Sequence, residues 1–202
     1  MKKEELAARL KHACAALVDS EAELTEIDSK FGDADHGLTM VKIAGAIEKA
    51  VDGAEGGIQS MLDDVAMEVM VLNGGSAVPL WNAWLDGMQE GAPEGDEVDA
   101  AGLKAIFASG FESLDDMSGA KVGDKTMMDA LIPATEAVAA YEGSDEQELL
   151  ALAARAAEQG AEDSRQYVAK FGRAKSYGQK TIGTPDAGAV SMSRFFRGLA
   201  EE

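Results

Sequence analysis

The chain has 202 residues, with 37 acidic and 18 basic side chains, a formal net charge of -19 and a sequence pI of about 4.4. Because such an acidic surface repels other polyanions, we expect neither nucleic acid nor an anionic membrane as a partner. The length suits one domain over residues 1–202, and no run of about 18 apolar residues predicts a transmembrane helix. With Cys14 as the single cysteine and an amphipathic start, we expect a cytoplasmic protein without an intrachain disulfide.

Helical periodicity runs along most of the chain, and alternation of β-branched residues is nearly absent. Buried helix faces are predicted for Leu6, Leu10, Cys14 and Leu17; for Leu103, Ile106, Phe107, Phe111 and Leu114; for Met128, Leu131, Thr135 and Val138; and for Ala189, Met192, Phe196 and Leu199. Gly, Pro and Asp interrupt the pattern near 20–37, 53–57, 73–76, 91–98, 115–125, 142–144 and 171–188. Seven breaks predict an all-α, antiparallel bundle of about eight helices.

Three local features refine this prediction. Ser144 to Gln147 fits a capping box that opens a helix. Pro133 lies inside a helical pattern and is expected to kink it. The segment 91–98 is expected to form a flexible surface turn.

Four connections, 25–37, 73–79, 117–126 and 171–188, are unusually long or polar, and such loops in helical bundles tend to be functional. They are the first, third, fifth and seventh connections. If the helices alternate in direction, odd-numbered connections meet at the same end of the bundle. The sequence therefore predicts a site built from loops at one mouth.

The first of these connections holds Asp28, Asp33 and Asp35 within eight residues. Carboxylates this close repel one another unless a cation lies between them, and Mg²⁺ prefers oxygen ligands together with substrate phosphates. An EF-hand is excluded, because Leu38 and Ala44 occupy the positions where glycine and a bidentate glutamate are required. The alternative interpretation is that Asp33 or Asp35 caps the helix that begins near Gly37.

The other connections carry residue types that can bind phosphate. Asn73-Gly74-Gly75-Ser76 precedes a helix, where glycines let backbone N–H groups approach an anion. The stretch 119–127 is a second glycine-bearing loop, for which an ordinary helix connection capped by Asp124 is the alternative. In the last connection, Arg173 can fork onto phosphate oxygens, and Asp186 can cap the final helix or hold a ligand hydroxyl.

These stretches together resemble the nucleotide-binding (L) subunit of dihydroxyacetone kinases, which is also the C-terminal domain of single-chain dihydroxyacetone kinases. The resemblance covers nearly the whole chain. It rests on Asp28-x4-Asp33-Ala-Asp35-His36-Gly37, on Gly74-Gly75-Ser76, on Gly123-Asp124-Lys125-Thr126-Met127-Met128-Asp129-Ala130-Leu131 with Pro133-Ala134, on Gly172-Arg173-Ala174, and on Ile182-Gly183-x2-Asp186-x-Gly188-Ala189. Ala77 and Val78 depart from the pattern, and Val78 is expected to add bulk beside the phosphates.

The resemblance implies an eight-helix antiparallel barrel with the nucleotide in loops at one mouth. It implies that Asp28, Asp33 and Asp35 hold two Mg²⁺ ions on an ADP or ATP molecule, with Arg173 assisting phosphoryl transfer. The implied nucleotide contacts are His36, Thr39, Gly74, Gly75, Ser76, Gly119, Thr126, Met127, Arg173 and Asp186.

The resemblance also implies a function in phosphorylating dihydroxyacetone or a related small ketose held by a separate K subunit. Two donors are open: a bound ADP rephosphorylated by a phosphohistidine protein of the phosphotransferase system, which we favour for a separate L chain, or exchanging ATP. A nucleotide-sensing regulatory module with little turnover is the alternative function, and a helical scaffold with incidental aspartates is the remaining one.

Overall fold

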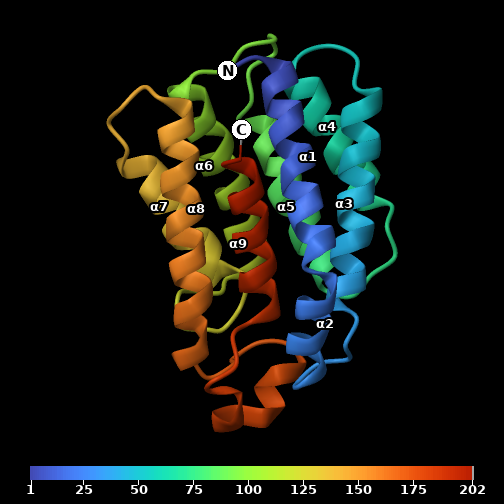
Figure 1. Cartoon of the computed structure of the whole chain (residues 1–202), viewed down its shortest axis with the longest axis vertical. Helices are drawn as coiled ribbons and strands as arrows, with labels where there is room; N and C mark the ends of the chain where they lie inside the picture. The colour runs from blue at the N-terminus through green and yellow to red at the C-terminus, as the bar shows by residue number, and fades with distance from the viewer. Residues whose placement is uncertain (202) are drawn as a thin grey trace.

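The computed structural model of the chain describes residues 1–201, which contain nine α-helices, two 3₁₀ helices and no strand (Figure 1). The helices are α1 (Lys3–Asp19), α2 (Glu21–Ser29), α3 (His36–Gly53), α4 (Ile58–Met70), α5 (Ala77–Glu90), α6 (Ala100–Ser118), α7 (Met128–Ala140), α8 (Glu146–Asp163), η1 (Ser164–Gln166), η2 (Arg173–Thr181) and α9 (Ala187–Leu199). No helix in this part of the chain has the length and apolar character needed to cross a membrane.

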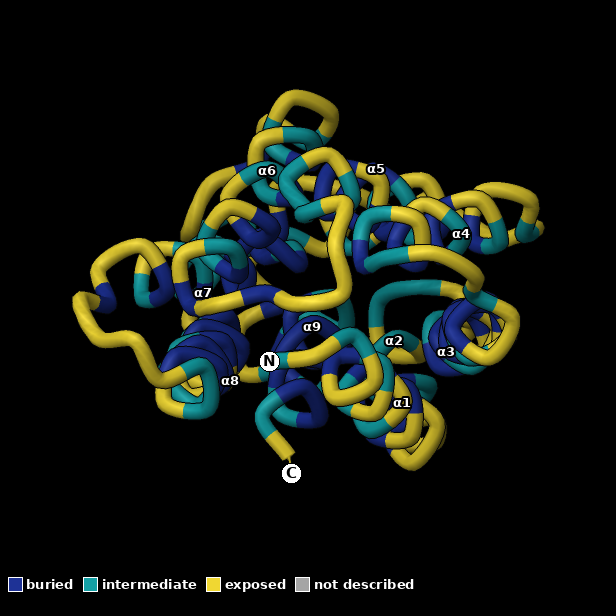
Figure 2. Tube along the Cα trace, turned by 90° about the horizontal axis from the view of Figure 1, so that it is seen from above, coloured by how far each residue is buried: buried dark blue, intermediate teal, exposed yellow. Residues whose placement is uncertain are grey.

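The eight long helices form a closed ring. Each packs against the next in the order α1, α3, α4, α5, α6, α7, α8 and α9, and α9 packs back against α1 (Figures 1 and 2). Buried residues from all eight belong to one continuous apolar cluster. The prediction of an all-α, antiparallel eight-helix barrel or bundle is confirmed.

Inside this ring, Trp81 and Trp84 from α5 pack against Phe195 and Phe196 from α9. The three contacts among Trp81, Trp84 and Phe195 are edge-to-face, with centroids 5.3–5.6 Å apart. This is the geometry that the ring quadrupole favours. The tryptophans are thus core residues that join α5 to α9 across the barrel.

The ninth α-helix, α2, was not expected, because the whole stretch 20–37 was predicted to be a break. Residues 21–29 contain neither Gly nor Pro and include the good helix formers Glu, Ala and Leu, so they add a short helix below α1. Leu24 anchors α2 because its side chain is completely buried. The true break is therefore the shorter turn 30–35, immediately before α3.

Two other local predictions need correction. The cap of α8 is Asp145, whose side chain accepts the Glu148 N–H, so the helix begins one residue later than the capping box expected at Ser144. The segment 91–98 is tied down rather than free, because Gly95 O accepts the Ile58 N–H and Val98 N–H donates to Met1 O.

Helix α7 continues through Pro133. Because proline has no N–H, the Asp129 carbonyl one turn earlier lacks its helical donor. Gly160 of α8 lies directly against that carbonyl, and a Cβ added to it would fall 2.0 Å from the Asp129 oxygen. The close approach of α7 and α8 therefore requires glycine here, and it fixes Asp129 at the start of α7.

Candidate active site at the mouth of the barrel

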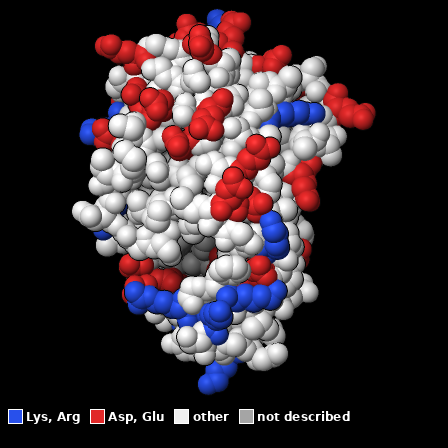
Figure 3. Space-filling view, turned by 180° about the vertical axis from the view of Figure 1, so that it is seen from behind, with Lys and Arg blue, Asp and Glu red and all other residues white. Residues whose placement is uncertain are grey.

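A cleft of about 450 Å³ opens at the end of the barrel where the four long connections meet. Its walls contain Asp28 to Thr39, Gly75 to Trp81, Met117 to Met127 and Phe171 to Gly188, although not every residue in those ranges. This gathering of the odd-numbered connections confirms the expectation from helix alternation. Figure 3 shows a hollow at this end with acidic side chains at its rim and Lys and Arg side chains gathered below it.

The three predicted aspartates converge at the edge of this cleft. Each of Asp28, Asp33 and Asp35 offers a carboxylate oxygen within 4.8 Å of the others. Asp28 comes from the last turn of α2, and its Oδ2 accepts the backbone N–H of Asp35 at 3.1 Å. Asp35 occupies the N-cap position of α3, but its side chain accepts no capping hydrogen bond. Its carboxylate is thus not used in capping the helix and lies beside those of Asp28 and Asp33.

Electrostatics within the triad favour a bound cation. Burial, together with the neighbouring carboxylates of Asp33 and Asp28, raises the pKa of Asp35. Arg173 partly offsets this repulsion, because its Nη2 lies 2.7 Å from Asp33 Oδ2. Three oxygen donors on one edge of a cleft fit a hard divalent cation such as Mg²⁺.

His36 follows the triad at the start of α3 and also lines the cleft. Its Nε2 lies 3.0 Å from Ser191 Oγ on α9, and that hydroxyl already donates to Gly188 O. A hydrogen bond therefore joins the His36 imidazole to the Ser191 hydroxyl. Burial lowers the pKa of His36, so its neutral form connects the metal-side turn to α9.

The glycine loop before α5 is open to the cleft. Gly75 and Ser76 line it, and a Cβ added to Gly75 would meet no atom within 4 Å. Val78 does not line the cleft: it is 4% exposed, and its Cγ2 lies 2.4 Å from where a Cβ on Gly74 would be. The expectation that Val78 crowds the loop was wrong; its side chain instead packs beneath Gly74.

The 119–127 loop contributes Lys125, Thr126 and Met127 to the cleft wall, whereas Met128 is buried in the core. Gly119 ends α6 in the left-handed conformation, with φ of +62°, and does not line the cleft. Gly74 likewise lies just outside the lining. The remaining residues expected to contact a nucleotide, Thr39 and Asp186 included, are brought together here.

Sequence reasoning missed the residue that organises this loop, Asp129. Its completely buried carboxylate accepts the N–H groups of Gly123 and Thr126, both at 2.6 Å. Burial raises its pKa, and these two hydrogen bonds act in the opposite direction. An acidic residue at the start of a helix, directly after a glycine-bearing loop, was the available signal.

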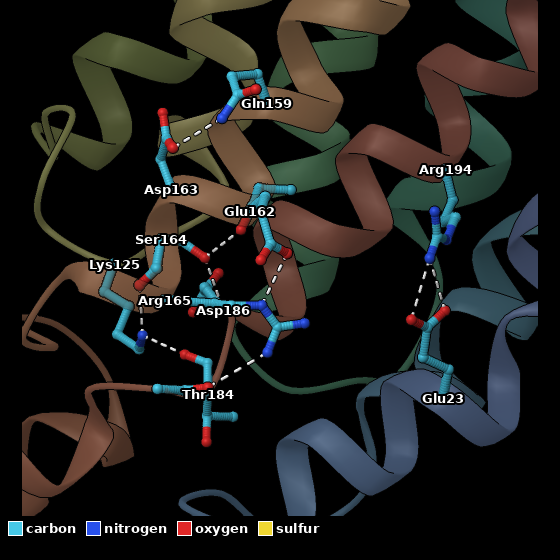
Figure 4. A network of polar contacts seen from close by, with 12 residues as sticks. Glu23, Lys125, Gln159, Glu162, Asp163, Ser164, Arg165, Thr184, Asp186 and Arg194 are labelled. Atoms are coloured by element: carbon cyan, nitrogen blue, oxygen red, sulfur yellow. Dashed lines mark hydrogen bonds and ion pairs between the residues drawn. The ribbon is translucent and has the colours of Figure 1, made fainter.

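Asp186 caps α9 by accepting the Ala189 N–H at 2.9 Å, and its own N–H donates to Ser164 Oγ (Figure 4). The capping alternative for this residue is therefore realised, and the carboxylate also lines the cleft. Burial raises its pKa from 3.8 to about 7.

This raised pKa predicts a pH dependence of stability. The folded state holds the Asp186 proton more tightly than the unfolded chain, so its contribution to stability falls as pH rises from about 4 to about 7. Asp186→Asn keeps the N-cap acceptor but removes the titration. Urea unfolding at about pH 5 and about pH 8 should show the variant gaining stability relative to the parent protein at the higher pH. An equal difference at both pH values would contradict this assignment.

Fold and site together define an all-α protein with a candidate oxygen-ligand metal site at the mouth of a helical barrel. Residues 30–201 match the DAK2 domain family, and the chain belongs to that family. Asp28 lies just before the matched residues.

Two curated relatives illustrate the similarity. The chain is 37% identical to a D-erythrulose kinase of Mycolicibacterium smegmatis, over 92% of this chain and 33% of that protein. It is 30% identical to the ADP-binding subunit DhaL of the PEP-dependent dihydroxyacetone kinase of Escherichia coli, over 93% of this chain and 91% of that one. The chain thus spans about a third of the erythrulose kinase and nearly the whole of the DhaL subunit.

Among solved structures, the chain is similar to the dihydroxyacetone kinase of C. freundii in complex with AMP-PNP and Mg²⁺. The TM-score is 0.72 and the sequence identity 26%, over 96% of this chain and 33% of that one. This similarity, together with the family match, agrees with the L-subunit fold predicted from the sequence.

Proposed function

We propose that the chain is the Mg²⁺–nucleotide-binding part of a kinase that phosphorylates a three- or four-carbon hydroxyketone. The observation that carries this proposal is the convergence of Asp28, Asp33 and Asp35 at the edge of a cleft that also holds Arg173 and a glycine loop. Relatives named as dihydroxyacetone and erythrulose kinases support the substrate class. The DhaL relatives, named as ADP-binding subunits, support the nucleotide.

Within this proposal, Asp28, Asp33 and Asp35 would hold two Mg²⁺ ions. When bound, the metal would neutralise charge on phosphate oxygens, which is the main requirement of phosphoryl transfer. Gly75 and Ser76 present backbone and hydroxyl groups at the N-terminus of α5, where an anion is favoured. Thr126 and Met127 form the wall of the cleft that we assign to the base.

Arg173 supplies an exposed positive charge in this scheme. Its side chain is 71% exposed, and its contact in this structure is the carboxylate of Asp33. A guanidinium released from Asp33 can form paired hydrogen bonds with phosphate oxygens, which suits the charge that develops during transfer. We therefore assign Arg173 a role in transfer as well as in nucleotide binding.

The hydroxyketone would be held by a K-type partner subunit or domain. The single-chain relatives, of which this chain spans a third, support the presence of such a domain elsewhere in the kinase. For the donor, the DhaL relatives support a resident ADP recharged by a phosphotransferase-system protein, as the sequence led us to expect. The similar dihydroxyacetone kinase of C. freundii was solved in complex with AMP-PNP, an ATP analogue, which supports exchanging ATP as the second candidate.

The protein is expected to bind ADP or ATP in a Mg²⁺-dependent manner. Mass spectrometry of the purified protein, before and after EDTA, measures the retained nucleotide, and calorimetry measures affinity. ADP retained until chelation supports the resident cofactor, whereas reversible ATP binding supports exchange. Absence of nucleotide binding in Mg²⁺ would overturn the proposal.

Phosphoryl transfer is tested separately by adding a dihydroxyacetone-binding K subunit with dihydroxyacetone or erythrulose. Product formation supports the kinase. Nucleotide binding with no transfer to either ketose would instead favour the regulatory module considered from the sequence.

A further inference from the structure

Between α8 and α9, the chain leaves the barrel at Ser164 and returns at Asp186. We call residues 164–186 the excursion, and its two ends, 164–165 and 183–186, the neck. Two backbone N–H groups close this neck: Gly183 donates to Arg165 O at 2.7 Å, and Asp186 donates to Ser164 Oγ at 2.8 Å. The 164–186 excursion, which includes η1 and η2, is therefore held together at its two ends. In Figure 1 it lies at the open end of the barrel, beneath the helices.

The excursion carries Arg173 to the metal-side turn. Arg173 lies on Asp33, and the ring of Tyr177 packs on Phe31 with centroids 5.2 Å apart. The position of Arg173 over the candidate metal site thus depends on how this excursion leaves the barrel.

Lys125 joins both sides of the neck from a third segment. Its Nζ donates to Ser164 O, where the chain leaves the barrel, at 2.6 Å. It also donates to Thr184 O, where the chain returns, at 2.5 Å (Figure 4). The residue is 5% exposed, and its φ of +62° is unusual for a non-glycine residue. The structure thus maintains a strained backbone and a buried ammonium at this point.

The residue before it makes a second attachment to the same excursion. Asp124 Oδ1 accepts from Lys170 Nζ at 2.6 Å, and Asp124 O accepts the Lys170 N–H at 3.1 Å. Both attachments come from the loop that places Thr126 and Met127 in the cleft wall. The wall assigned to the base is therefore linked directly to the segment that carries Arg173.

We propose that Lys125 is a positioning residue that clamps the two ends of the 164–186 excursion and thereby sets where Arg173 lies over the three carboxylates. Lys125 also lines the cleft, but two carbonyl oxygens engage its ammonium, so it acts through the excursion. The consequence for nucleotide binding rests on the function proposed above, whereas the clamp itself does not.

The first test is a double-mutant cycle on ADP affinity in Mg²⁺, measured by calorimetry with the full chain. Lys125→Met and Arg173→Ala are each expected to weaken binding about tenfold, the effect of roughly one charge-assisted hydrogen bond. The double variant should lose little more than either single variant, because an unclamped excursion no longer delivers Arg173. Additive losses, or no loss in Lys125→Met, would overturn the proposal.

Lys104 offers a matched control. It lies on α6, and its Nζ also donates to a backbone carbonyl, that of Tyr141, at the opposite end of the barrel. Lys104→Met removes an equivalent ammonium away from the excursion. It should leave ADP affinity unchanged and act additively with Arg173→Ala.

Hydrogen exchange without nucleotide tests the clamp on its own. The neck N–H groups of Gly183 and Asp186 should exchange about tenfold faster in Lys125→Met than in the parent or in Lys104→Met. Lys125→Gly provides a second variant if the first folds poorly, because glycine accepts the positive φ without strain. Unchanged neck exchange would overturn the clamp. Faster exchange in a protein that binds no ADP would retain the clamp and reject the proposed function.

Discussion

Asp35→Asn is expected to weaken Mg²⁺-dependent ADP binding about 100-fold or more, and at the same time to stabilise the metal-free protein. Mutation of a residue that hydrogen-bonds to a metal ligand typically lowers metal affinity about 10- to 100-fold. Loss of a ligand itself should therefore lower it at least as much. The two effects have opposite signs because the same three carboxylates that fit a cation repel one another without it.

The stability gain follows from the environment of Asp35. Burial and the charges of Asp33 and Asp28 raise its pKa, so its ionised form opposes folding at neutral pH. Asparagine removes that charge, and the Asp35 side chain makes no capping bond that would be lost. We therefore expect the charge of Asp35 to lower the stability of the metal-free protein, as is common at functional sites.

Calorimetric titration of ADP in Mg²⁺, and thermal unfolding in EDTA, measure the two effects. Asp63→Asn, at an exposed aspartate of α4 away from the cleft, is the control and should change neither quantity. Retention of full affinity by Asp35→Asn would exclude Asp35 as a metal ligand.

The second large effect is expected for Asp129→Asn, which should destabilise the protein by about 2 kcal/mol and weaken ADP binding. The carboxylate of Asp129 accepts two backbone N–H groups, from Gly123 and Thr126. An asparagine side chain offers one acceptor oxygen and sets its NH₂ group against the other N–H. One of these two part-buried donors then loses its partner inside the protein, and an unsatisfied donor costs about 1–3 kcal/mol.

Denaturant unfolding and ADP titration measure this variant. Asp99→Asn is the matched control: Asp99 accepts a single N–H, from Gly102, at the N-cap of α6, and asparagine caps a helix equally well. If Asp129→Asn were as harmless as Asp99→Asn, Asp129 would not organise the loop.

Local patterns were sufficient for the class of fold and for the place of the site. Each helix stripe, such as Leu6 to Leu17, records which face is buried, and each glycine cluster records where the chain must turn. The aspartates at 28, 33 and 35 were visible because they lie within eight residues of one another. Alternation of helix direction then placed the four long loops at one mouth.

The interior partners of the site were not accessible in the same way. From the sequence, Lys125 was one residue of a glycine-bearing loop and Arg173 a candidate phosphate ligand. In the structure, Lys125 binds carbonyls of residues 164 and 184, and Arg173 lies on Asp33, far away in the chain. Similarly, the sequence predicted that Val78 adds bulk beside the phosphates, whereas in the structure its side chain packs beneath Gly74.

The sequence by itself therefore determined the all-α class, the order of helices and loops and the candidate metal ligands, because each of these is encoded by neighbours in the chain. The tertiary structure decided which polar groups are buried and what they bind. Asp129 organises a loop and Lys125 closes a neck because helix packing removes them from water and brings them to backbone groups from distant segments. A buried charge must find such partners, and sequence spacing alone does not reveal which ones it finds.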